Sequence, residues 1–385
     1  MDNDNVEIPY YEEPPSYQSF LEKHLKPNIP ALIGPALTKE WKARKEWVVA
    51  NDTQDEQSPR YKPNYDYLRQ KYGATKVQVA RCNKRHFTDQ ERSEMTFTEF
   101  SLLWHGKEPC DYYLKDWHFV KALPEEKVYT VPDVFKDDWL NEYWLSKSDD
   151  DYKFSYMGGD TTFTPLHADV YRSYSWSSNI CGIKKWTMFP PNQEDCFKDK
   201  FGNMVYDVRH VDPSVFPHFE KAKKIVLYQR DGETLFVPSG WFHQVENIGS
   251  TISINHNWFN ACNIEFTYQS LKGDLRDVRE AISDLTDMMS PLEFTEQCQQ
   301  LLLAHSGWDW SIFLNLLACI SHRLCVQSYW ENQPPPEWQA REVKRILEQW
   351  VSDESATFMP WIESSGLNDV LFTVFKDINN VLENK

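Results

Sequence analysis

Three side chains with the chemistry of metal ligands stand near the middle of this 385-residue chain. His167 and Asp169 are two positions apart, and residues two apart on a β-strand point to the same face. One imidazole and one carboxylate would then project side by side, and His243, further along the chain, is the best candidate for a third ligand. Two imidazoles and one carboxylate form the facial triad that binds non-heme Fe(II) and leaves positions open for other ligands.

The His-x-Asp pair is weak evidence when taken alone, because such a pair can equally be hydrogen-bonded on an exposed strand. The residues around it carry more weight. A strand-like run with Gly182 and Lys184 follows the pair, and a Pro-Ser-Gly turn at residues 238–240 precedes His243. A turn of this kind brings the next strand back, so that His243 can face the same pocket.

Lys184 is the second feature with chemical meaning. It shares one strand face with Trp186, whereas Lys185 lies on the other face. A lysine that points into a barrel is costly unless an anion pairs with it. The sequence therefore predicts that Lys184 binds a ligand carboxylate, and the alternative is that both lysines are solvated. Four further polar side chains are candidates for the same ligand: Thr164, Tyr113, Asn255 and Asn257.

The elements that must position these residues are short. Strand-like runs with turn signals fill residues 154–259, which favours a sandwich, barrel or jelly roll. The polar run Asn83–Glu94 reads as a loop, and residues 65–72 read as a helix stopped by Gly73. Apolar residues at alternating spacings of four and three in residues 264–285 predict an amphipathic helix, and helical patterns continue to residue 382.

Composition excludes several functional classes. The net charge of −17 argues against non-specific binding to nucleic acid or to an anionic membrane, and it is compatible with a basic protein substrate. The eight cysteines form no CxxC pair, which argues against a zinc ribbon or a disulfide framework. No apolar run is long enough to span a bilayer. We expect a cytoplasmic protein that could also occur in the nucleus, with no nucleic-acid or membrane partner.

The combined motifs resemble the JmjC family of Fe(II)- and 2-oxoglutarate-dependent oxygenases. They are the TPxHxD run at residues 164–169, the GIKKW run at 182–186, and the VPSGWxHxVxN run at 237–247. The resemblance implies a mainly β fold with α elements, whose core is a double-stranded β-helix, also called a jelly roll or cupin-like fold. It implies that His167, Asp169 and His243 hold Fe(II), that O₂ is a cosubstrate, and that Lys184 pairs with the distal carboxylate of 2-oxoglutarate. Thr164 and Tyr113 match positions that hydrogen-bond this carboxylate in the family.

Composition, residue patterns and this resemblance together suggest four segments. Residues 1–15 would be a flexible acidic leader and residues 16–110 a mixed α/β segment. Residues 111–262 would be the JmjC catalytic core, and residues 263–385 a helical region. Because small hydroxylases of this family often dimerise through C-terminal helices, a homodimer through this last region is expected.

Three runs resemble the lysyl hydroxylase branch of the family: residues 113–118, 138–142 and 252–258. That resemblance implies hydroxylation of a lysine side-chain carbon in a translation release factor. The alternative is a histone N-methyl-lysine demethylase, against which stand the absence of a Cys/His-rich finger and of a basic chromatin-binding tract. A non-catalytic binding protein is a third reading, which the complete ligand set and Lys184 disfavour.

Overall fold

The fold is described from a computed structural model, which covers residues 7–51, 58–106, 110–148, 150–327 and 331–383. Its contacts divide the chain into two compact units. The first unit comprises Met1–Pro132, Asp149–Val170 and Tyr174–Asn257, and the second comprises Asp133–Ser148, Tyr171–Ser173 and Trp258–Lys385. No helix within the described ranges is both long and apolar enough to cross a membrane.

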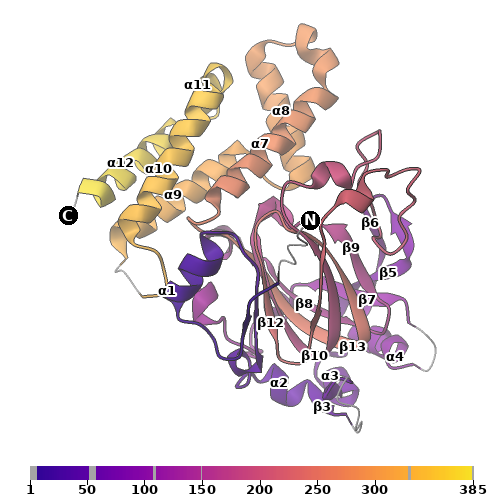
Figure 1. The fold of residues 1–385 in the computed structure, drawn as a ribbon. Coiled ribbons are helices and arrows are strands. Elements are labelled where there is room, and N and C mark those ends of the chain that lie inside the picture. The colour runs from indigo at the N-terminus through magenta and orange to yellow at the C-terminus, as the bar shows by residue number, and fades with distance from the viewer. Residues whose placement is uncertain (1–6, 52–57, 107–109, 149, 328–330, 384–385) are drawn as a thin grey trace, which may run out of the picture. The chain divides into compact units, whose positions relative to one another are not determined.

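The first unit is built on one large sheet, which has eleven strands in the described residues (Figure 1). The strand order is β1-β2-β12-β10-β13-β8-β7-β5-β6, with β11 paired to β10 and β9 paired to β13. Only the β1–β2 pair, among the pairs described, is parallel. The strands are β1 (Tyr10–Tyr11), β2 (Ala31–Ile33), β5 (Lys76–His86), β6 (Asp89–Thr96), β7 (Tyr112–Trp117), β8 (Lys153–Gly158), β9 (Phe163–His167), β10 (Tyr174–Phe189), β11 (Ile225–Gln229), β12 (Thr234–Val237) and β13 (Phe242–Trp258).

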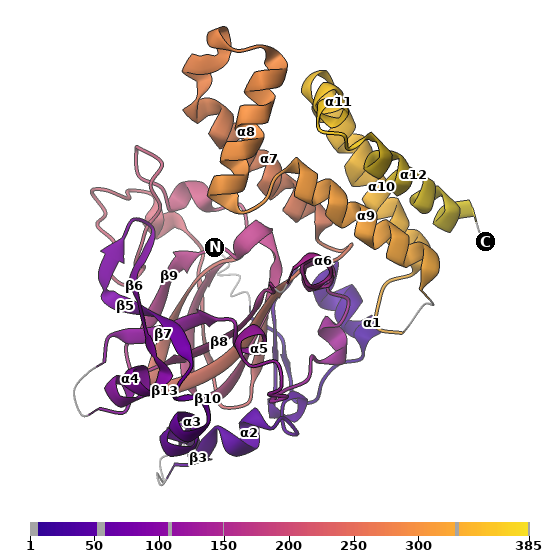
Figure 2. The same ribbon diagram turned by 180° about the vertical axis from the view of Figure 1, so that it is seen from behind.

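The two longest strands, β10 and β13, are neighbours in this sheet and lie side by side in both views (Figure 2). Most of their side chains on both faces are removed from water, and this burial stabilises the two strands. One apolar cluster packs Trp186 and Met188 of β10 against Leu235, Val237 and Trp241. These strands therefore form a rigid frame for the polar side chains that project between them.

Short helices and a separate hairpin complete the first unit. They are α1 (Tyr17–Phe20), α2 (Ala43–Glu46), α3 (Tyr65–Tyr72), α4 (Phe97–Trp104), α5 (Phe119–Ala122) and the pair β3 (Val48–Ala50) and β4 (Tyr61–Pro63). Helix α3 has the predicted bounds. Helix α4 begins with a capping box, in which the side chains of Thr96 and Glu99 each accept the other's backbone N–H.

One local prediction was wrong. The run Asn83–Glu94 is not a loop, because β5 continues to His86 and returns as β6 from Asp89. Its side chains are polar because β6 is an edge strand of the sheet, and cross-strand ion pairs such as Lys84–Glu91 lie in solvent. Of the leader predicted over residues 1–15, residues 1–6 lie outside the described residues, and Tyr10–Tyr11 forms β1.

The second unit is helical in its described residues. Its helices are α6 (Trp139–Lys147), α7 (Ile264–Ala281), α8 (Pro291–Ser306), α9 (Trp310–Val326), α10 (Pro336–Asp353), α11 (Ser355–Ser364) and α12 (Asn368–Glu383). Helices α9, α10 and α12 pack together (Figure 1). Aromatic rings of Trp310, Phe313, Trp350 and Phe358 contact one another in its core. The C-terminal region thus has a core of its own.

Candidate functional site

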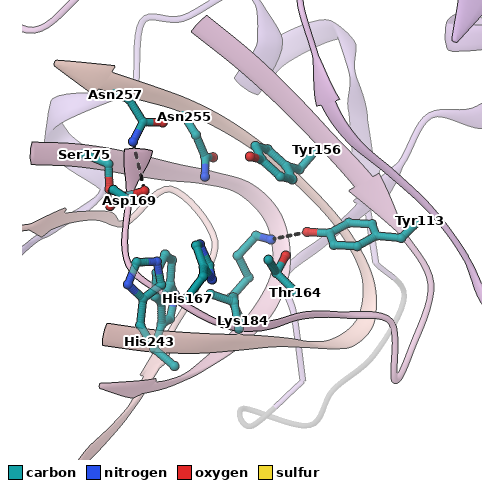
Figure 3. Close-up of a pocket in the computed structure, with 12 residues that line it drawn as sticks. Tyr113, Tyr156, Thr164, His167, Asp169, Ser175, Lys184, His243, Asn255 and Asn257 are labelled. Atoms are coloured by element: carbon teal, nitrogen blue, oxygen red, sulfur yellow. Dashed lines mark hydrogen bonds between the residues drawn. The ribbon is translucent and has the colours of Figure 1, made fainter. Parts of the chain in front are cut away.

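The three predicted metal ligands meet in one pocket of the first unit (Figure 3). Strand β9 pairs with β13 so that His167 lies directly opposite His243, and their ring centroids are 4.3 Å apart. Asp169 completes the group, and the ligand atoms of the three residues all lie within 4.8 Å of one another. Two imidazoles and a carboxylate at this spacing could hold one divalent transition-metal ion.

The route by which Asp169 reaches the site differs from the prediction. Strand β9 ends at His167, so Asp169 lies in the loop beyond it and not on the pleat of the strand. The two side chains meet because the chain turns after His167, and the shared strand face that we expected plays no part.

The two imidazoles are held in the form that binds metal. Nδ1 of His167 is 2.8 Å from the carbonyl oxygen of Pro165, and Nδ1 of His243 is 2.9 Å from that of Trp241. A carbonyl oxygen can only accept, so each Nδ1 carries a hydrogen, and in the neutral form of the ring Nε2 keeps a lone pair for a metal. Burial, helped by the neighbouring His167, lowers the pKa of His243 to about 4, so this ring is neutral at pH 7.

The carboxylate of Asp169 is held by two side chains from the neighbouring long strands. Its Oδ2 accepts a hydrogen bond from the hydroxyl of Ser175, 2.7 Å away, and its Oδ1 accepts one from the amide of Asn257, 2.8 Å away. The sequence predicted Asn257 as a cosubstrate contact, and the structure places its amide on a metal-ligand candidate (Figure 3).

Lys184 lies in the same pocket and is 2% exposed. Its Nζ donates to the hydroxyl of Tyr113 and to Oδ1 of Asn247, each 3.1 Å away, and no ion pair to it is found within the described residues. Burial lowers the pKa of Lys184 to about 7. A buried cation without a carboxylate partner fits a site that receives an anionic ligand. Lys185, by contrast, is partly exposed and pairs with Glu246 at 3.2 Å.

The other predicted contacts lie in the pocket wall. Thr164, Tyr113 and Asn255 all line it, and Oδ1 of Asn255 accepts a hydrogen bond from Ser177. Three site residues were not predicted from the sequence. They are Ser175 and Tyr156, which line the pocket together with Trp186 and Val245, and Asn247, which accepts a hydrogen bond from Lys184. The alternation His243, Val245, Asn247 along β13 is a period of two that could have identified Asn247. No comparable sequence signal marks Tyr156.

The empty space in and around the pocket is about 430 Å³, a volume that includes open solvent. Metal-ligand candidates stand at one end and the buried ammonium group at the other (Figure 3). The hydroxyl groups of Thr164, Tyr113 and Tyr156 also line the pocket. This arrangement suits a small acid that chelates a metal at one end and presents a carboxylate to Lys184 at the other.

Comparison with known proteins agrees with this geometry. A family model described as a cupin-like domain matches residues 17–264, and with the large antiparallel sheet it confirms the predicted fold class. A zebrafish (Danio rerio) protein named 2-oxoglutarate and iron-dependent oxygenase JMJD4 is 40% identical over 82% of this chain and 75% of its own. Arginine-specific demethylase JMJ20 of Arabidopsis thaliana is 41% identical over 82% of this chain and 70% of its own. JmjC domain-containing protein 1 of Schizosaccharomyces pombe is 30% identical over 95% of both chains.

Proposed function

The chain belongs to the JmjC branch of the cupin-like domain family, and from this premise we propose that it is a protein hydroxylase acting on a lysine side chain. Its general enzyme class is that of the 2-oxoglutarate- and iron-dependent oxygenases. The observation that carries this function is the placement of three metal-ligand candidates and an unpaired buried lysine in one pocket.

In this proposal His167, Asp169 and His243 hold Fe(II), and Lys184 binds the distal carboxylate of 2-oxoglutarate. The iron, when bound, supplies O₂ activation coupled to oxidative decarboxylation of 2-oxoglutarate, which puts a hydroxyl on a substrate carbon. The donor set fits this metal, because neutral imidazoles and a carboxylate leave further coordination positions open.

The chain's own groups bind and orient the cosubstrate. Lys184 would attract the carboxylate, and the hydroxyls of Tyr113 and Thr164 would donate hydrogen bonds to it. Asn255 would contribute its amide from β13. Because Lys184 and Tyr113 are buried, water competes poorly for these contacts, and the acid is held in one orientation.

We propose a lysine of a translation release factor as the target. The resemblance of three runs to the lysyl hydroxylase branch supports this choice, and the net charge of −17 suits a basic substrate segment. The test is to incubate purified release factor with the enzyme, Fe(II), 2-oxoglutarate and O₂, and to analyse its peptides by mass spectrometry. We expect the mass of one oxygen atom on a lysine, absent with His167→Ala enzyme. No added oxygen on any lysine would reject this target.

Demethylation is a second candidate, because one similar protein is named an arginine-specific demethylase. The histone N-methyl-lysine version of this activity belongs to the same class. Removal of an N-methyl group releases formaldehyde, whereas carbon hydroxylation does not. Assays of methyl-arginine and methyl-lysine peptides for formaldehyde therefore separate the two functions. A homodimer through the C-terminal helices stays a prediction, which light scattering of the full chain would test.

A further inference from the structure

The three metal-ligand candidates are oriented in two different ways. Each histidine donates from Nδ1 to the backbone carbonyl two residues before it, so the adjoining backbone fixes its ring. Asp169 lies beyond the end of β9, where no strand pairing holds it. Its carboxylate therefore needs other groups to orient it.

Two donors meet this need, one on each oxygen. Ser175, on β10, donates to Oδ2, and Asn257, on β13, donates to Oδ1. Both side chains are at least nine-tenths buried, at 7% and 8% exposure. Since β10 and β13 are adjacent strands of the sheet, the two donors are held at a fixed separation. We call this pair of side chains the carboxylate clamp.

We propose that Ser175 and Asn257 are positioning residues that orient Asp169 for metal binding, and that Asn257 acts here and not as a contact to 2-oxoglutarate. This inference rests on the metal-binding part of the proposed function and is independent of the substrate. A carboxylate free to rotate would lose orientational preference for the metal, and groups that orient metal ligands typically contribute 10- to 100-fold to affinity.

The chain supplies a matched control on the same two strands. Ser177 and Asn255 lie two residues from Ser175 and Asn257, and Ser177 donates to Asn255 at 3.2 Å. Ser177 is more buried than Ser175, at 1% against 7% exposure, and its hydroxyl donates to Asn255 instead of Asp169. Ser177→Ala therefore removes a buried hydroxyl from the same strand without touching the clamp.

The experiment measures Mn(II) binding to the metal-free full chain by isothermal titration calorimetry, with Mn(II) as a redox-stable probe. We expect Ser175→Ala and Asn257→Ala each to weaken Mn(II) binding about 10- to 100-fold, and Ser177→Ala to change it less than about threefold. The Co(II) absorption spectrum at saturating metal should also change in the clamp variants only, because ligand geometry sets it. If one clamp variant fails to unfold cooperatively, the other carries the test alone.

Two results would overturn the clamp. One is wild-type Mn(II) affinity in a folded clamp variant, and the other is an equal loss of affinity in Ser177→Ala. Neither result depends on finding a protein substrate. Conversely, a release factor that is never hydroxylated would reject the proposed target while the metal affinities still decide the clamp.

Discussion

Lys184 should lower the free energy of unfolding of the ligand-free protein, although the proposed function depends on this residue. The native chain holds this lysine with a pKa of about 7, against 10.5 for a free lysine. Each tenfold change in proton affinity corresponds to about 1.4 kcal/mol, so keeping Lys184 charged in the fold costs on the order of 5 kcal/mol. Replacement by Met removes this cost but also removes the hydrogen bonds that Lys184 donates to Tyr113 and Asn247, a loss of about 1–3 kcal/mol. Lys184→Met should therefore stabilise the metal-free protein by roughly 2–4 kcal/mol at pH 7.

The sign of the pH dependence follows from the same numbers. Between pH 7 and about 10.5 the unfolded chain keeps a proton on Lys184 that the native chain has released, so wild-type stability rises with pH in this window. The advantage of Lys184→Met should shrink by about 1.4 kcal/mol per pH unit above pH 7, and near pH 10.5 the variant should be the less stable protein, because only the lost hydrogen bonds then distinguish the two. Urea unfolding at several pH values measures it. Lys185→Met is the control, since Lys185 is partly exposed and its replacement should show no such trend.

Binding of the cosubstrate provides the second half of this test. A carboxylate placed against Lys184 favours its charged form. Binding of 2-oxoglutarate at pH 8 should therefore be accompanied by uptake of about one proton on Lys184. Calorimetry of the Mn(II)-loaded protein in buffers of different ionisation enthalpy measures this uptake. Lys184→Met should weaken 2-oxoglutarate binding on the order of 100-fold, because a buried charge pair is lost. A stability difference that stays constant from pH 7 to pH 10, or binding without proton uptake, would refute the reasoning.

Three further predictions concern the metal, a glycine of β10 and the helical unit. His243→Ala should abolish the gain in stability that Mn(II) gives the wild type, about 2.7 kcal/mol at 100 times Kd, as thermal unfolding would record. Gly182→Ala puts a Cβ 2.5 Å from the carbonyl oxygen of Ser250 at a φ of +82°, so urea unfolding should show a loss of about 2 kcal/mol or more, with weaker 2-oxoglutarate binding. Arg323→Met leaves buried Asp137, whose pKa burial raises to about 6, without its cation. The loss, about 3–5 kcal/mol at pH 8, should be smaller at pH 5, where the acid takes up a proton, and a loss equal at both pH values would contradict this account.

Residue type and local spacing were enough to predict much of the site's chemistry. His243 was identified by the turn before it, and Lys184 by the apolar partner two positions away, and both lie in one pocket. The family prediction is likewise confirmed, because its motifs are short and local. The helix predicted at Tyr65–Tyr72 has the bounds of α3, since an Asn cap and a Gly stop mark its ends in the sequence.

What the sequence could not show depends on contacts between distant segments. Beyond Ala80 the hairpin of β5 and β6 has no apolar period, because most of its side chains there are exposed or half-buried. Ser175 and Asn257 reach Asp169 only because β10 and β13 are neighbours, which no local pattern encodes.

The alternation of side chains along β10 shows how one residue can determine which side chains face the pocket. Ser175 and Lys184 both line the pocket, although they are nine positions apart. On an unbroken pleat an odd separation puts two side chains on opposite faces, so the alternation must shift once between them. Gly182 is the residue in this interval with a left-handed φ, of +82°, among those described. Gly182, two residues before Lys184, therefore turns this lysine inward and Lys185 outward. Both directions were predicted from simple alternation alone, without this physical cause.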